Sequence, residues 1–193
     1  MNEIQLIRAQ LATERQHASA VANACARALE RAGGEAHAGG SPLETFRQAC
    51  VEYLVCVLAW FEERDQRLAD LAQSRLQPDD PARRALEDVL ARRGRSREVL
   101  EKLEAACAAA TATVSDGGHG GSWLEFAQFF NNVWSARRDA VDALLAPNPR
   151  VTDWRAVGGI DADSILEERR RYARVSARLP AGVTLAPAYS VAG

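Results

Sequence analysis

The stretch that decides the fold is residues 41–76, SPLETFRQACVEYLVCVLAWFEERDQRLADLAQSRL. Ser41 and Glu44 form a capping box, and Pro42 occupies the first helical position, so a helix is predicted to begin here. Apolar residues then recur at spacings of three and four, which indicates one face of a long amphipathic helix. That face consists of Leu43, Phe46, Cys50, Tyr53, Leu54, Val57, Trp60, Phe61, Leu68 and Leu71. The helix is predicted to end near Leu76.

Three further long helices are predicted around this one. The first stops at Gly33, the third begins at Pro81, and the fourth follows a second capping box at Ser122. The predicted spans are about 2–32, 81–113 and 123–146. Four long amphipathic helices with modest connections favour an all-α, up-down antiparallel four-helix bundle over residues 1–146.

The C-terminal part, residues 147–193, is predicted to pack on this bundle. Its first segment, PNPRVTDWRAVGGI (147–160), is expected to be an extended strap with Trp154 docked on the bundle. A fifth helix is predicted over about 162–179, with Ile165, Leu166, Tyr172 and Leu179 as its apolar side. The remaining tail is expected to be loose.

Composition limits the classes of function. The 26 acidic and 24 basic side chains give a net charge of −2, so charge provides no case for nucleic acid or a membrane surface as partner. All but one of the basic residues are arginine, which is typical of a GC-rich bacterial genome. Neither a signal peptide nor a run of ~20 apolar residues appears, so a cytoplasmic protein without a membrane span is expected.

The four cysteines, Cys25, Cys50, Cys56 and Cys107, all fall within apolar helical patterns. None is part of a C-x-x-C motif or of a cysteine and histidine spacing that binds zinc. Buried free thiols in a reducing compartment are therefore expected.

A short motif occurs twice in the predicted bundle. W-x-x-x-R-D begins at Trp60 in the second helix and at Trp134 in the fourth. The two copies are compatible either with two related helical hairpins or with chance, since arginine and aspartate are frequent in this chain.

Charged residues also interrupt the apolar seams. At 1.5 Å rise per residue, these interruptions lie roughly 24 to 30 Å from the same end of an up-down bundle, so they would share one layer. The predicted layer contains Glu14, Arg64, Asp65, Arg93, Arg138 and Asp139. If it is buried, its members must pair with one another or with a ligand. The alternative is that the arginine stems lie along the surface with their charged ends in water.

Over about residues 1–146 this arrangement resembles the hemerythrin-like bundles, in which four antiparallel helices hold two irons through histidine and carboxylate ligands. His17 falls at the place of the first-helix histidine. The other matching positions are Trp60 with Arg64, Trp134 with Asp139, and Arg93 with Arg97. Only His17 and Asp139 keep a ligand type, and tryptophan or arginine cannot hold iron. The resemblance therefore implies a metal-free relative, without a cofactor, whose former site has become an arginine, aspartate and tryptophan cluster.

A second resemblance concerns residues 43–61, LETFRQACVEYLVCVLAWF, and residues 123–130, WLEFAQFF. These stretches are similar to the helical anti-sigma proteins that hold the housekeeping sigma factor. This resemblance implies a protein partner bound on the helix faces.

Catalytic motifs are scarce. The three histidines are His17 in the first helix and His37 and His119 in glycine-rich stretches, and no phosphate-binding loop or nucleophile motif is present. We therefore expect a non-enzymatic binding or regulatory protein that takes a small anionic or aromatic ligand in this predicted layer of arginine, aspartate and tryptophan side chains. The alternatives are an anti-sigma-type partner-binding regulator and a hemerythrin-like metal or oxygen-binding protein. The candidate ligand-binding residues are Glu14, His17, Trp60, Arg64, Asp65, Arg93, Trp134, Arg138 and Asp139.

Overall fold

The computed structural model describes residues 2–32, 41–110, 119–145, 149–159 and 161–185. Side chains at a few helical positions within these ranges, among them Arg93, Trp134 and Cys107, lie outside the description. Every regular element in the described ranges is a helix, which confirms the all-α prediction. None of the helices in these ranges is long and apolar enough to cross a membrane.

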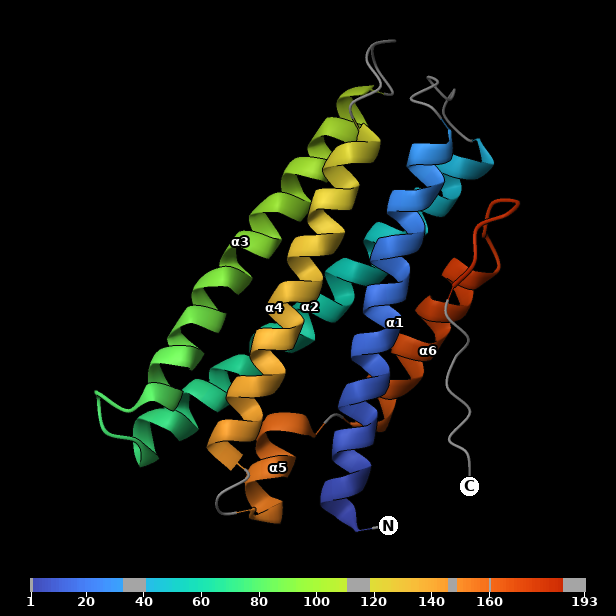
Figure 1. Cartoon of the computed structure of the whole chain (residues 1–193). Coiled ribbons are helices and arrows are strands. Elements are labelled where there is room, and N and C mark those ends of the chain that lie inside the picture. The colour runs from blue at the N-terminus through green and yellow to red at the C-terminus, as the bar shows by residue number, and fades with distance from the viewer. Residues whose placement is uncertain (1, 33–40, 111–118, 146–148, 160, 186–193) are drawn as a thin grey trace.

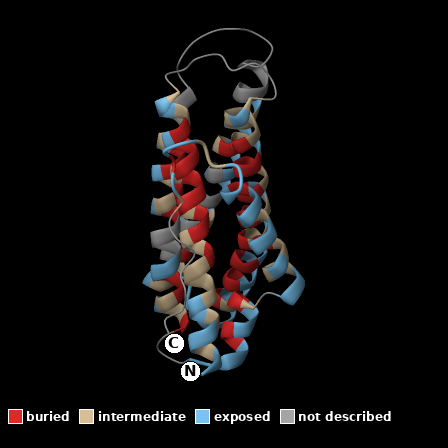
Figure 2. Cartoon of the chain, turned by 90° about the vertical axis from the view of Figure 1, so that its right-hand side faces the viewer, coloured by how far each residue is buried: buried red, intermediate tan, exposed pale blue. Residues whose placement is uncertain are grey.

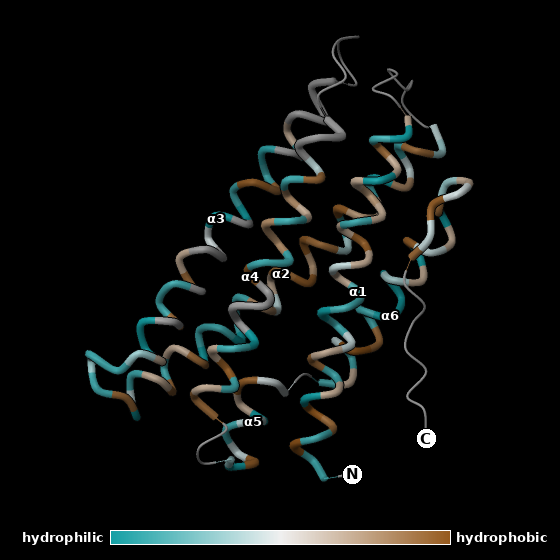
Figure 3. Tube along the Cα trace, viewed as in Figure 1, coloured by the Kyte–Doolittle hydropathy of each residue, from teal (hydrophilic) through white to brown (hydrophobic). Residues whose placement is uncertain are grey.

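Four long helices make up most of the molecule: α1 (Glu3–Arg31), α2 (Pro42–Arg75), α3 (Pro81–Ala110) and α4 (His119–Leu145). Successive helices run in opposite directions, and α2 crosses the others diagonally (Figure 1). The helix α4 lies between α1 and α3, and α2 contacts both α1 and α3. Hydrophilic and hydrophobic residues alternate along each helix, as expected when one side faces the interior (Figure 3).

Local sequence explains where the first two helices begin. In α1 the Asn2 side chain accepts a hydrogen bond from the Gln5 N–H, and the Gln5 side chain accepts one from the Asn2 N–H, both at 2.9 Å. In α2 the Ser41 hydroxyl oxygen accepts from the Glu44 N–H at 3.1 Å, as predicted. The Glu44 carboxylate binds Arg47, with 2.8 Å between Oε2 and Nε. These caps satisfy N–H groups that the first turn of a helix leaves without partners.

The start of α4 differs from the prediction. The helix begins at His119, so Ser122 lies inside it and is not its N-cap. Glycine in a helix interior costs only about 1 kcal/mol relative to alanine, and the packing of an adjoining helical segment can outweigh that cost. Trp123, just beyond the glycines, is fully buried in the core.

The strap prediction is wrong for its central part, because Val151–Gly158 forms the helix α5. Its N-cap, Arg150, makes no side-chain capping bond, so local signals for a helix are weak. Tertiary contacts supply what the local sequence lacks: Trp154 and Val157 are buried, and Asp153 pairs with Arg75 of α2 at 2.6 and 2.7 Å. The expected docking of Trp154 is confirmed.

The last helix, α6, spans Ala162–Ser176, and Asp161 caps it by accepting from the Ser164 N–H at 2.7 Å. It packs on α2, on the outside of the molecule (Figure 1). Tyr172 and Val175 face the core, whereas Leu166, predicted to be on the apolar side, is exposed.

The interior contains two apolar clusters, and buried residues run along the facing sides of the helices (Figure 2). The first cluster joins α1, α2 and α4 with α6 and includes the rings of Phe46, Tyr53, Trp123, Phe126 and Phe130. The second joins the other ends of α1, α2 and α4 to α5 and includes Leu68, Val141, Leu145, Trp154 and Val157.

The cysteines that the structure describes are free thiols. Cys25 and Cys50 are fully buried, as expected, whereas Cys56 is half-buried. Burial raises the pKa of the Cys25 thiol well above its usual range, so this thiol stays protonated at neutral pH.

Candidate functional site

Buried polar and charged residues separate the two apolar clusters. On α1, Glu14 and His17 lie between Leu11 of the second cluster and Ala18 of the first. On α2, Arg64 and Asp65 lie in the same way between Phe61 and Leu68, members of the first and second clusters. We call these residues together with Glu168 the polar layer.

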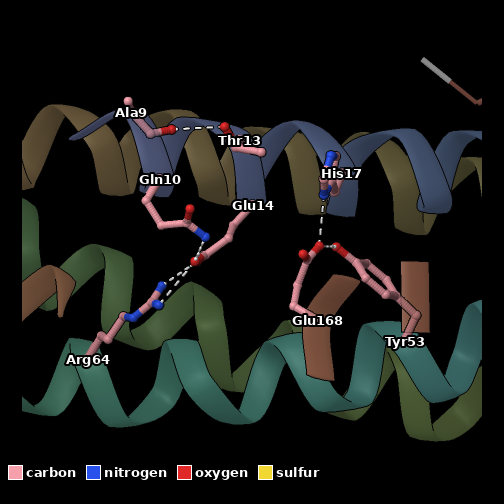
Figure 4. A network of polar contacts seen from close by, with 8 residues as sticks. All are labelled: Ala9, Gln10, Thr13, Glu14, His17, Tyr53, Arg64 and Glu168. Atoms are coloured by element: carbon pink, nitrogen blue, oxygen red, sulfur yellow. Dashed lines mark hydrogen bonds and ion pairs between the residues drawn. The ribbon is translucent and has the colours of Figure 1, made fainter. Parts of the chain in front are cut away.

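Glu14 and Arg64 form the ion pair at the centre of the polar layer (Figure 4). Arg64 donates from Nη1 to Glu14 Oε2 at 2.6 Å, with a longer contact of 3.4 Å from Nη2 to Oε1. The Gln10 amide donates to Glu14 Oε1 at 2.8 Å. Because the two residues are only 1% and 2% exposed, the pair satisfies charges that would be costly to bury alone. Of the outcomes left open for the predicted layer, these two residues therefore take the buried, mutually paired one.

A second polar group connects α1, α2 and α6. Glu168 Oε1 lies 2.8 Å from His17 Nδ1 and accepts a hydrogen bond from the Tyr53 hydroxyl at 2.7 Å (Figure 4). The Tyr172 ring stacks on the His17 ring with 3.9 Å between centroids. Burial, together with the neighbouring Glu168 carboxylate, raises the pKa of Tyr53 well above its usual range. The Tyr53 hydroxyl therefore remains a donor.

This geometry limits the chemistry of His17. A carboxylate at Nδ1 orients an imidazole and leaves Nε2 as its second functional nitrogen. Nε2 is buried, however, and within the described chain it has no hydrogen-bond partner. Because Nε2 is buried while Nδ1 faces Glu168, the observed contacts of His17 and Tyr53 with Glu168 connect α6 with α1 and α2. No set of three or more metal-ligating side chains occurs among the described residues.

Arg138 and Asp139 do not belong to the buried layer, contrary to the prediction. Their side chains are 53% and 65% exposed, and they pair with each other at 2.8 Å. The buried residues of α4 in this region are Val133, Ala140 and Val141, which places Arg138 off the apolar seam. The two copies of W-x-x-x-R-D therefore differ in environment, because Arg64 of the first copy is buried.

The remaining predicted site residues divide into three kinds. Asp65 is buried, as the layer prediction requires. Trp60 is half-buried and packs on the first apolar cluster. The side chains of Arg93 and Trp134 lie outside the described residues.

Sequence reasoning missed Glu168, which completes the polar layer from α6. A signal was present: Ile165, Tyr172, Val175 and Leu179 follow the heptad spacing of an inward face, and Glu168 occupies the remaining inward position. Tyr53 was recognised only as an apolar stripe residue, although a buried tyrosine hydroxyl needs a partner.

A cleft of about 160 Å³ lies between α1, α4 and α5. Its apolar lining comes from Leu11, Ala12, Val141 and Trp154, and its charged lining from Arg8, Arg15, Arg138 and Asp142. Arg8 pairs with Asp142 at 3.1 Å, and its guanidinium lies 5.4 Å from the centre of the Trp154 ring. Half-buried Arg15 has no ion-pair partner among the described residues.

The fold and these features define an all-helical protein with a charged layer inside and a cationic cleft outside. No protein-family model, curated protein or solved structure matches the chain.

Proposed function

We propose that this chain is a non-enzymatic binding protein that holds a small anion in the cleft between α1, α4 and α5. The proposal takes α1 to α4 as an up-down antiparallel four-helix bundle, residues 1–146, with residues 147–193 packed on it. The C-terminal part contributes directly, because Trp154 of α5 forms one wall of the cleft.

The proposal rests on Arg15, which lines the cleft and has no ion-pair partner in the part of the chain that the structure describes. Three arginines line the cleft against one acidic residue, Asp142, so the lining has a net positive charge. Asp142 neutralises Arg8, and Asp139 neutralises Arg138 from just beside the cleft. Arg15 is left to bind an anion, and its planar guanidinium matches a carboxylate or phosphate with two parallel hydrogen bonds.

In this proposal the polar layer stabilises the packing of the helices that form the cleft, and it is not itself the binding site. Glu14 and Arg64 satisfy each other, and Glu168 already accepts from Tyr53 and contacts His17. A ligand entering there would have to break buried ion pairs, which costs several kcal/mol. Of the predicted ligand-binding residues, we therefore retain Arg138 as a contact and assign Glu14, His17 and Arg64 to the interior support.

The test is calorimetric titration of the protein with acetate, sulfate and benzoate at low ionic strength. At least one of these anions is expected to bind with one-to-one stoichiometry, and Arg15→Gln is expected to weaken it at least tenfold because the unpaired cation is lost. Arg67→Gln is the matched control, since Arg67 is an exposed α2 arginine that pairs with Glu63 outside the cleft. Absence of saturable binding by all three anions, or equal affinity of both variants, would refute the proposal.

The hemerythrin-like alternative predicts bound metal. We expect none, because tryptophan and arginine occupy most of the matching ligand positions and neither coordinates iron. Metal analysis and a visible absorption spectrum of the purified protein should show less than a tenth of an equivalent of iron, zinc or manganese per chain. One equivalent that survives dialysis against a chelator would favour that alternative.

The anti-sigma alternative proposes a protein partner on the helix faces. Leu166 is exposed on the outer side of α6, where Arg170 and Arg174 follow at four-residue spacing. A mixed apolar and basic face of this kind suits an acidic partner. We rank it second, because glutamates already pair with both arginines.

A further inference from the structure

We infer that the ligand of the cleft is an aromatic monocarboxylate, with its carboxylate on Arg15 and its ring against the apolar lining. This inference rests on the proposed function and narrows it to one chemical class. The aromatic class is indicated by the cleft, where an apolar lining and a charged lining meet. Neither the composition of the chain nor the polar layer indicates it.

The apolar lining determines that the ligand has a hydrophobic part. Leu11, Ala12, Val141 and Trp154 come from α1, α4 and α5 and meet in this cleft. A fully hydrated anion such as sulfate would leave these side chains without contacts, whereas an apolar group there gains affinity by leaving water.

The size of the cleft favours one aromatic ring. Its volume is about 160 Å³, and a cavity of about 150 Å³ with an apolar lining admits benzene. Ala12 is the smallest of the apolar lining residues and leaves space for a flat ring, whereas bulky substituents on that ring would exceed the volume of the cleft.

The charged lining of the cleft indicates that the ligand has a single negative charge. Arg8 is already paired with Asp142 and Arg138 with Asp139, so Arg15 is the one lining arginine without an ion-pair partner among the described residues. One carboxylate is enough to pair with it, and a monocarboxylate with its charge at one end can meet Arg15 while its ring packs on the apolar lining.

The experiment compares ligands that differ in one feature each, using calorimetry on the full chain. The ligands are benzoate, acetate, sulfate, benzyl alcohol and 3,5-di-tert-butylbenzoate. Benzoate is expected to bind at least tenfold more tightly than each of the others. The first three comparisons test the ring and the charge, and the bulky benzoate tests the size of the cleft without any substitution.

A steric variant tests the position of the ring. Ala12→Leu fills the cleft but leaves Arg15 in place, so it is expected to weaken benzoate at least tenfold and leave acetate unchanged. Ala9→Leu is the matched control, because Ala9 is an exposed alanine of α1 outside the cleft lining. Circular dichroism of both variants checks that they are folded. If Ala12→Leu is unfolded, the comparison of benzoate with 3,5-di-tert-butylbenzoate on the wild type tests the position of the ring by itself.

The outcomes separate the inference from the proposed function. If acetate or sulfate binds as tightly as benzoate and Arg15→Gln abolishes that binding, the aromatic class is wrong and the anion site stands. Tight binding of benzyl alcohol or of the bulky benzoate also overturns the inference. If no anion binds at all, both fail.

Discussion

Arg64→Ala is expected to lower the free energy of unfolding by about 3 to 5 kcal/mol, because it leaves the Glu14 carboxylate charged and unpaired in the interior. Arg64 is the cation that contacts both carboxylate oxygens of Glu14, and the Gln10 amide alone cannot replace its charge. The loss is also structural, since the arginine side chain fills space between the two apolar clusters.

Urea titrations of the wild type and the variant measure this effect through the unfolding midpoint and slope. Arg67→Ala is the control, because Arg67 lies on the same helix in an exposed pair with Glu63 and should cost about 0 to 1 kcal/mol. Replacing both Glu14 and Arg64 by leucine should restore most of the lost stability, since no unpaired charge then remains. If Arg64→Ala and Arg67→Ala lower the free energy of unfolding equally, the Arg64 side chain is exposed to solvent and the buried ion pair is absent.

Glu168→Ala is expected to have the next largest effect, lowering the free energy of unfolding by about 2 to 5 kcal/mol. The substitution removes the acceptor of the Tyr53 hydroxyl and the partner of His17 Nδ1, and each stranded buried group costs about 1 to 3 kcal/mol. Because Glu168 of α6 contacts His17 of α1 and the Tyr53 hydroxyl of α2, the loss should be concentrated at α6 (Figure 4).

Hydrogen exchange with mass spectrometry tests the location, and urea titration tests the size of the effect. Amides of Ala162–Ser176 should exchange faster in Glu168→Ala, while α3 keeps its protection. Glu167→Ala is the adjacent control, since Glu167 pairs with Arg170 and Arg171 near the surface and its loss should cost about 0 to 1 kcal/mol. If Glu168→Ala and Glu167→Ala have equal effects on the free energy of unfolding and on the exchange of α6, Glu168 does not stabilise the packing of α6.

The sequence by itself determined the four long helices, the helix α6 and the candidate members of a charged layer. Caps such as Ser41 act over a few residues, so the local pattern contains all the information that they need. The sequence also placed Glu14 and Arg64 in one charged layer, because both interrupt apolar seams at matching heights, and a buried charge needs an opposite charge nearby. The caps need only local sequence, whereas the layer needs the rise per residue together with the expected antiparallel order of the helices.

Tertiary structure alone decided which helix faces meet. Each residue turns a helix by about 100°, so the way the helices cross, as with the diagonal course of α2, decides which side chains meet a neighbouring helix (Figure 1). Arg138 lies outside because the seam of α4 that meets its neighbours runs through Val133, Ala140 and Val141. The helix α5 forms because contacts of Trp154 and Asp153 stabilise it where local propensity does not. The contact of Glu168 with His17 joins residues more than 100 positions apart in the sequence. The cleft beside Arg15 does the same. Such combinations depend on packing between helices, which no local pattern contains.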